Sequence, residues 1–369
     1  MKFTCTQENF NKALSTVSHI ASRSATLPIL NNVLIEVKKG LINLSSTNLE
    51  IGINTSLRGK VEKEGSFTVQ AKLIADYINL LPKENIEVEL KEQSLYLKCQ
   101  NHETYIKGLE ASDFPIIPEV ERKQPVVVKS NELKQALNQV MFAVTLDESR
   151  PEISGILFML DQKNLTLVGT DSYRLAEKRI PLVNKLDEEY KLIIPLRTLQ
   201  ELSRILAEVD KTEITFCINE SQILFALDEE VELVSRLIEG QYPDYQQIIP
   251  TDYKTKVKVK TNELVRIIKS ASLFCKPGIN DVKFNLLTDK NELVVSAANS
   301  GVGENTITLK TDIEGSTNKV VFNYRYFLDG LNNLNSDEVI IQLVSDSAPG
   351  VVKPEGKSDY LYIVMPIRQ

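Results

Sequence analysis

The strongest constraint on the fold of this chain is a helical pattern that occurs three times. The segments KSNELKQALNQVMFA and KTNELVRIIKSASLF, which begin at residues 129 and 260, share N-E-L followed by apolar residues at positions i, i+3, i+4 and i+7. The segment TQENFNKALSTVSHIA, which begins at residue 6, has apolar residues in the same phase. This spacing predicts three amphipathic helices, and Ser130 and Thr261 are the expected N-caps of two of them.

The residues after each helix repeat as well. Two short apolar runs follow, then a second helical pattern (FTVQAKLIADYINLL, LIIPLRTLQELSRIL and VVFNYRYFLDGLNNL), then an alternating strand. A period of about 125 residues is far longer than that of a solenoid, and so predicts tandem copies of a whole domain. We place these domains at 1–124, 125–251 and 252–369. Two helices packed on antiparallel sheets make each copy an α+β unit.

Composition narrows the class of protein. The chain is 42% hydrophobic and 25% charged, and no stretch approaches the roughly 20 apolar residues of a membrane helix. The N-terminus lacks a secretory signal, and the four cysteines are scattered without a CxxC pair. A net charge of −7 argues against coating of nucleic acid by bulk positive charge. We expect a soluble cytoplasmic protein with no disulfide, zinc site or cofactor.

Motifs for catalysis are missing from the sequence. It contains no phosphate-binding loop, no G-x-S-x-G and no H-E-x-x-H, and its two histidines, His19 and His102, lie far apart. The run LDEE occurs at residues 186–189 and 227–230, where carboxylates could bind a metal, although solvated turns explain it better. A metal-dependent hydrolase or nuclease therefore stays a rival interpretation, and a scaffold that binds only proteins is another.

Basic residues recur at one position of the repeat. Lys72, Arg197 and Arg325 align near the start of the three second helices. Amphipathic helices normally carry charge on their outer face, so one such residue would mean little. Recurrence in three copies instead favours a continuous, weakly positive surface, because equivalent helices of tandem domains line one face.

Four short segments resemble the bacterial sliding clamp family, the β subunit of DNA polymerase III. They are TLPIL near the start, TDSYRL in the middle, YPDY after it and MPIR at the end, and the three copies between them cover the whole chain. The resemblance implies a non-enzymatic processivity factor, a head-to-tail homodimer whose six domains close a ring around duplex DNA. It also implies pore-facing basic residues, which here are Arg23, Lys72, Lys134, Arg197, Arg204, Arg266 and Arg325.

The resemblance further implies partners and two protein interfaces. The DNA polymerase III alpha subunit, the clamp loader, other polymerases and repair proteins would insert short peptides into an apolar groove. Its implied residues are Arg150, Ile153, Thr170, Ser172, Tyr173, Arg174, Leu175, Pro243, Ile248, Val364, Met365, Pro366, Ile367 and Arg368. The implied dimer contact joins Thr104 and Ile106 to Leu273 and Phe274. Tyr173, Gln246, Gln247 and Gln369 depart from the family pattern and leave the peptide preference open.

Overall fold

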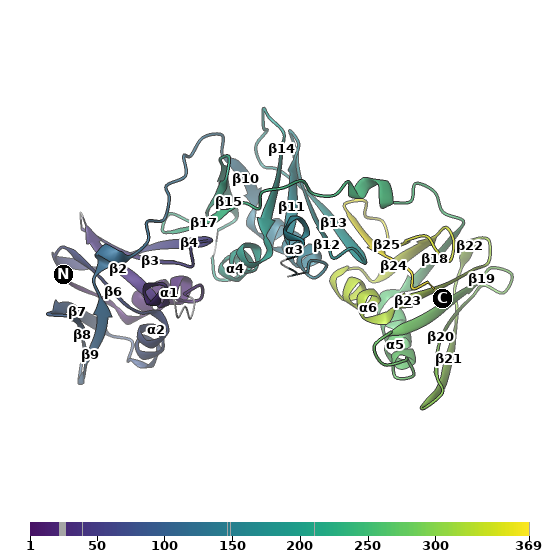
Figure 1. Cartoon of the computed structure of the whole chain (residues 1–369), viewed down its shortest axis with the longest axis horizontal. Coiled ribbons are helices and arrows are strands. Elements are labelled where there is room, and N and C mark those ends of the chain that lie inside the picture. The colour runs from purple at the N-terminus through teal and green to yellow at the C-terminus, as the bar shows by residue number, and fades with distance from the viewer. Residues whose placement is uncertain (22–26, 39, 146, 148, 210, 369) are drawn as a thin grey trace. The chain divides into compact units, whose positions relative to one another are not determined.

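The computed structural model describes residues 1–21, 27–38, 40–145, 147, 149–209 and 211–368 (Figure 1). The chain forms two compact units. Unit 1 comprises residues 1–131 and 197–237, and unit 2 comprises residues 132–196 and 238–369. Each unit therefore holds one complete copy of the repeat and part of the second copy.

All six predicted helices are present. They are α1 (Gln7–Ser18), α2 (Ala71–Leu80), α3 (Ser130–Met141), α4 (Leu196–Leu206), α5 (Thr261–Ser272) and α6 (Tyr324–Asn333). The predicted caps are wrong by one residue, because Ser130 and Thr261 are the first residues of their helices. Side-chain caps exist elsewhere: the hydroxyl of Thr6 accepts a bond from the Asn9 N–H in α1, and the amide oxygen of Asn323 accepts one from the Arg325 N–H in α6.

Unit 1 is built on one 13-stranded sheet in the order β10-β15-β16-β17-β4-β3-β2-β6-β9-β8-β7-β1-β5. Helices α1 and α2 pack against each other, and α1 lies on the sheet beside β3 and β4 (Figure 1). The strands are β1 (Lys2–Thr6), β2 (Asn32–Lys38), β3 (Leu41–Thr47), β4 (Ile51–Leu57), β5 (Lys60–Lys63), β6 (Gly65–Gln70), β7 (Asn85–Lys91), β8 (Ser94–Cys99), β9 (His102–Leu109), β10 (Val126–Lys129), β15 (Glu213–Ile218), β16 (Gln222–Ala226) and β17 (Val231–Arg236).

Unit 2 contains a nine-stranded sheet, β14-β11-β12-β13-β26-β25-β24-β18-β22, and a four-stranded sheet, β21-β20-β19-β23. Helices α5 and α6 pack together beside the smaller sheet (Figure 1). The strands are β11 (Gly155–Leu160), β12 (Asn164–Thr170), β13 (Arg174–Pro181), β14 (Tyr190–Pro195), β18 (Thr255–Lys260), β19 (Asp281–Leu287), β20 (Glu292–Asn299), β21 (Gly303–Lys310), β22 (Ile313–Gly315), β23 (Asn318–Asn323), β24 (Glu338–Leu343), β25 (Gly350–Pro354) and β26 (Tyr360–Val364).

The predicted α+β class is confirmed. Strand pairs in the described residues are antiparallel, for example β2 with β3 and β11 with β12. The apolar residues of the helical repeat are the ones that face the sheets: Phe10 and Leu14 of α1, and Leu264 and Ile268 of α5, are fully buried. Each helix thus gains its stability by covering a sheet with one apolar stripe, as its period indicated.

Candidate functional site

A groove of about 200 Å³ opens on unit 2 where four separate chain segments meet. It is lined by Arg150, Ile153, Thr170, Ser172, Arg174, Leu175, Pro243, Asp244, Tyr245, Ile248, Ile363 and Met365. Nine of these residues belong to the predicted groove. Asp244, Tyr245 and Ile363 were missed by the sequence reasoning.

The floor of the groove exists because β13 pairs with β26. This antiparallel ladder sets Leu175 opposite Ile363, two residues far apart in the sequence that are both buried. Alternation along β26 turns the next residue, Val364, to the other face of the sheet, where it is fully buried. Val364 is therefore absent from the lining of this groove, and Ile363 lies there instead.

Beyond β26, the chain is held by main-chain bonds. The Met365 N–H donates to the carbonyl of Tyr173 at 2.8 Å, and the Ile367 N–H donates to the carbonyl of Val321 at 2.8 Å. Met365 reaches the groove, whereas Pro366, Ile367 and Arg368 lie outside its lining. Tyr173 also lies outside: its ring is 61% exposed and stacks on Tyr326 at 6.2 Å between ring centroids.

One wall of the groove is the loop that carries the sequence YPDY. Tyr245 is buried and its hydroxyl donates to Glu177 Oε2 on β13 at 2.6 Å. The hydroxyl of Tyr242 donates to the carbonyl of Val168 at 3.4 Å. Burial raises the pKa of both tyrosines, and the Glu177 carboxylate raises that of Tyr245 further, so both remain neutral donors. The two rings fix the loop against the sheet.

Arg174 anchors the opposite wall. Its Nε atom is 2.9 Å from Asp171 Oδ2 and its Nη1 atom is 2.5 Å from Asp329 Oδ2 on α6. The guanidinium carbon lies 4.6 Å from the centroid of the Tyr326 ring. Because the group is paired with two carboxylates and stacked on an aromatic face, it has one fixed orientation and presents its aliphatic stem to the groove.

The turn before Arg174 is also constrained. Ser172 has a φ of 76°, the left-handed region that non-glycine residues rarely adopt. Its hydroxyl accepts a 2.7 Å bond from Arg150 Nη1, and its N–H donates to the hydroxyl of Thr170. These bonds hold three polar residues of the groove in a single arrangement at its rim.

Three predicted basic residues occupy one structural position. Lys72, Arg197 and Arg325 are each the second residue of a helix, α2, α4 and α6, and each is exposed. On the first helices, Arg266 of α5 is exposed and Lys134 of α3 is half-buried. Arg23 lies outside the described residues. The alignment of the repeat thus identified a real positional equivalence.

Arg204 differs from the other predicted basic residues. Its Nε and Nη2 atoms donate to Glu201 Oε1 at 2.8 and 2.5 Å, and Nη2 also donates to the carbonyl of Thr16 on α1 at 2.8 Å. Glu201 is buried and its second oxygen is 2.6 Å from His19 Nδ1. These contacts join α4 to α1 within unit 1. Arg204 is therefore a structural ion-pair residue, and its prediction as a free pore cation is not supported by its surroundings.

Comparison with known proteins decides the family. The models of the N-terminal, central and C-terminal domains of the DNA polymerase III beta subunit match residues 1–118, 127–244 and 246–368. The chain belongs to the DNA polymerase III beta subunit family. Its function is that of the beta sliding clamps, processivity factors for a DNA polymerase that are not enzymes.

Full-length relatives share this assignment. The beta sliding clamps of Synechocystis sp. and Staphylococcus aureus are each 29% identical to this chain, over 389 and 378 residues respectively. Each match includes 100% of this chain and 99% of the relative. The crystal structure of the Bacillus subtilis sliding clamp is 27% identical, covers 100% of this chain with 99% of its own, and has a TM-score of 0.95. The Thermotoga maritima beta subunit gives 27% identity, coverage of 100% and 99%, and a TM-score of 0.94.

The residues predicted at the clamp's dimer contact divide into two groups. Leu273 is 74% exposed and Phe274 is half-buried, so both are available on the surface. Thr104 is half-buried, but Ile106 is only 5% exposed because it faces the clamp's own core beside Leu95. The assignment of Ile106 therefore needs correction. Apolar side chains that the sequence reasoning missed are exposed in unit 1: Leu73 and Leu80 on α2, and Tyr105 on β9.

Two features concern metal binding and membrane insertion. No cluster of three or more histidine, cysteine, aspartate or glutamate side chains that could hold a metal occurs among them. No helix in the described part of the chain has the length and apolar character needed to cross a membrane. In the second LDEE run, the Asp228 carboxylate accepts bonds from the N–H groups of Glu230 and Val231 and so holds a turn.

Proposed function

We propose that this clamp closes as a head-to-tail homodimer around duplex DNA. The support comes from two strand pairings that follow one rule. In unit 1, β4 of the first copy pairs with β17, the last strand of the second copy. In unit 2, β13 of the second copy pairs with β26, the last strand of the third copy. Since β4 and β13 occupy equivalent places in the repeat, each copy joins the next through the same two strands.

The same rule leaves one pair of strands to be joined. The equivalent of β4 and β13 in the third copy is β21, which is the edge of its four-stranded sheet. The equivalent of β17 and β26 in the first copy is β9, which pairs with β6 only at Thr68 to Leu109 and Val69 to Gly108. An unpaired strand edge is a template for another chain. Joining β21 of one chain to β9 of a second would repeat the rule, and two such contacts close a ring.

Apolar surface on both sides suits this contact. Leu73, Leu80 and Tyr105 are exposed in unit 1, and Leu273 and Val302 are exposed in unit 2. Exposed apolar groups that cluster beside a free strand edge are typical of a subunit interface. Thr104 and Phe274 belong to the same proposed contact, whereas Ile106 supports it from beneath.

Duplex DNA of any sequence would pass through this ring. We assign contact with its phosphates to Arg23, Lys72, Lys134, Arg197, Arg266 and Arg325. DNA carries one negative charge for about every 1.7 Å of its axis, so a strongly basic pore would resist movement. A closed ring retains DNA by topology, and a few mobile cations on a chain of net charge −7 leave it free to slide.

The groove would tether the clamp's partners. Its apolar residues are Ile153, Leu175, Pro243, Ile248 and Met365, which form a pocket suited to leucine or aromatic anchors. The expected sources of such peptides are the DNA polymerase III alpha subunit, the clamp loader, other polymerases and repair proteins in the cytoplasm. We retain domain boundaries at residues 124 and 251 for this arrangement.

Retention on DNA tests the proposal. The protein is loaded by a clamp loader onto a nicked circular duplex, separated by gel filtration, and then the circle is cut once. A sliding ring stays on the circle and leaves from the ends after cutting. Equal release from circular and linear DNA would refute the ring, and would favour the scaffold that binds only proteins. The variant Leu273→Glu, which charges the proposed dimer contact, serves as the control that should fail to be retained.

A further inference from the structure

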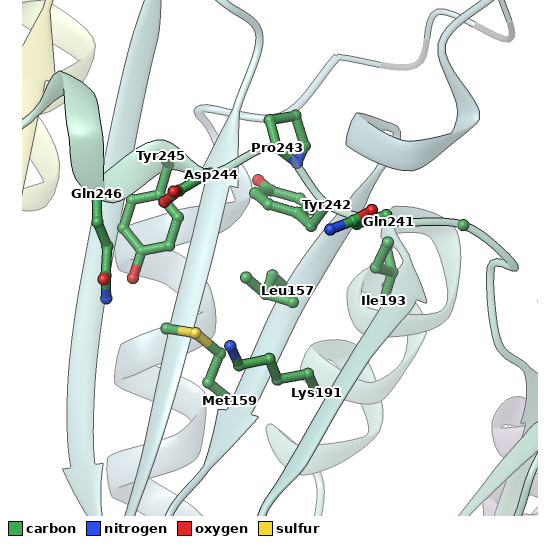
Figure 2. Close-up of a pocket in the computed structure, with 11 residues that line it drawn as sticks. Leu157, Met159, Lys191, Ile193, Gln241, Tyr242, Pro243, Asp244, Tyr245 and Gln246 are labelled. Atoms are coloured by element: carbon green, nitrogen blue, oxygen red, sulfur yellow. The ribbon is translucent and has the colours of Figure 1, made fainter.

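A second pocket lies beside the groove and shares its wall. It encloses about 470 Å³ and shares Pro243, Asp244 and Tyr245 with the groove (Figure 2). These three residues thus have a pocket on each side. The floor of the second pocket comes from β11 and β14 of unit 2.

Strand register explains this floor. Leu157 pairs with Ile193 and Met159 pairs with Lys191, and alternation directs all four side chains to the face of the sheet under the loop. Leu157 and Ile193 are buried, Met159 is half-buried and Lys191 is exposed. The pocket is therefore apolar at its base and has one ammonium group at its side, as Figure 2 shows.

The charged groups around the pocket differ in whether they have a bonding partner. The Asp244 carboxylate accepts a 2.8 Å bond from Gln247 Nε2, and the Glu177 carboxylate behind Tyr245 accepts the 2.6 Å bond of that hydroxyl. Lys191, in contrast, makes no ion pair with any residue that the structure describes. The pocket thus offers an apolar surface with the unpaired Lys191 ammonium group on one side and, in the loop wall, the Asp244 carboxylate, which the neutral Gln247 amide binds but does not neutralise. A ligand with an apolar side chain next to a carboxylate complements the Lys191 side of the pocket.

We infer that this second pocket binds the segment of a partner polypeptide that adjoins the groove-bound peptide. The inference rests on the proposed role of the groove, because a chain bound there has only to cross residues 243–245, which line both pockets, to reach the second one. The segment crosses Pro243, inserts an apolar side chain over Leu157 and Met159, and sets an acidic side chain or a C-terminal carboxylate against Lys191. Partners with this extension bind more tightly than partners that fill the groove alone.

Peptide binding to the full chain tests the inference. A fluorescein-labelled core peptide is selected from a random library as a groove binder, and is required to lose affinity for the Met365→Glu variant. It is then extended at either end by one to four alanines followed by Leu-Glu or Leu-Lys. We expect one Leu-Glu extension to lower the Kd by about tenfold, the equivalent of a single buried apolar group with a charge partner.

Charge reversal supplies the matched control. Lys191 is exposed, so Lys191→Glu keeps the fold, and it should abolish the gain from Leu-Glu and transfer it to Leu-Lys. If the core peptide binds but no extension improves the Kd, the second pocket is not a binding site and the groove proposal stands. If extensions help equally in wild type and Lys191→Glu with either terminal charge, Lys191 has no such role. If no selected peptide responds to Met365→Glu, the groove proposal fails and this inference fails with it.

Discussion

Replacing Arg204 by alanine distinguishes a structural ion pair from a DNA contact. In the wild type, the Glu201 carboxylate is 4% exposed and takes two bonds from Arg204, at 2.5 and 2.8 Å. Removal of the guanidinium leaves a buried charge whose remaining side-chain partner among the described residues is the exposed His19. Breaking one side of a buried pair costs about 3–5 kcal/mol. Because Arg204 itself is about a quarter exposed, we expect the low end, roughly 3 kcal/mol.

Urea unfolding followed by circular dichroism measures this loss. With an m value of about 3 kcal/mol/M, the midpoint of the transition should fall by about 1 M. The double variant Glu201→Gln with Arg204→Ala removes the stranded charge, so it should recover part of that difference. Arg197→Ala, in the exposed second position of the same helix, should change the free energy of unfolding by less than roughly 0.5 kcal/mol.

Direct DNA binding completes the comparison. In a titration of short linear duplex over a range of salt, where topology retains nothing, Arg197→Ala should raise the Kd and reduce its salt dependence, whereas Arg204→Ala, assayed at a temperature where it is folded, should behave as wild type. The reasoning is refuted if Arg204→Ala unfolds at the wild-type urea concentration and weakens DNA binding as strongly as Arg197→Ala. That pattern would mean that the guanidinium serves DNA and that its bonds to Glu201 contribute nothing.

Three further outcomes are expected. Tyr245→Phe removes the hydrogen bond to Glu177. It should raise the peptide Kd several-fold in fluorescence anisotropy and lower the free energy of unfolding by about 1 kcal/mol. An unchanged Kd would argue against the role of Tyr245 in holding the groove wall. Leu273→Glu should convert the dimer to monomer in sedimentation velocity, and a persistent dimer would contradict the proposed contact. Burial, and then Asp281, raise the pKa of Cys275 to about 11, so its reaction with a disulfide reagent should be slow at pH 8 and accelerate toward pH 11. Because the unfolded thiol ionises at lower pH, the stabilising contribution of Cys275 is lost as pH rises from about 9 to 11; fast labelling at pH 8 would show an ordinary thiol.

The helices and their buried faces could be predicted because both depend on local sequence. Phe10, Leu14, Leu264 and Ile268 repeat with the helical period, and all four are fully buried. The helix starts could not be fixed to the residue, since Thr261 is compatible with both the cap and the first turn. Periodicity thus specified which face packs, but not where each helix begins.

The groove was predictable only through resemblance, and the errors have a physical cause. Ile363 and Val364 are both apolar neighbours, and only the register of β26 against β13 decides which of them faces the groove. A one-residue change of phase exchanges the two faces of a strand. The same cause explains Ile106, which is buried while its neighbour Tyr105 on β9 is exposed. Pairing between distant segments, which sets these phases, has no local signal.

The ion pairs of Arg204 could have been predicted from the acidic residues around it in the sequence. Glu201 and Glu208 stand three residues before it and four residues after it, positions that face the same side of a helix. Lys72, Arg197 and Arg325 each have an acidic residue only at the second spacing, at Asp76, Glu201 and Asp329. Acidic residues at both spacings therefore distinguish Arg204 from the three aligned cations, whereas alignment of the repeat alone does not.

The difference between the ion-paired Arg204 and the exposed cations matters for how a clamp slides. Lys72, Arg197 and Arg325 stand at one place in each copy and make no ion pair with the residues that the structure describes, whereas Arg204 joins α4 to α1. Each phosphate neutralised by a protein strengthens the salt-dependent hold on DNA. In the proposed ring, cations that join the domains would strengthen the ring itself and leave its grip on phosphates weak. A ring that relies on closure for retention needs rigid joints more than it needs a basic pore, and the use of Arg204 follows that requirement.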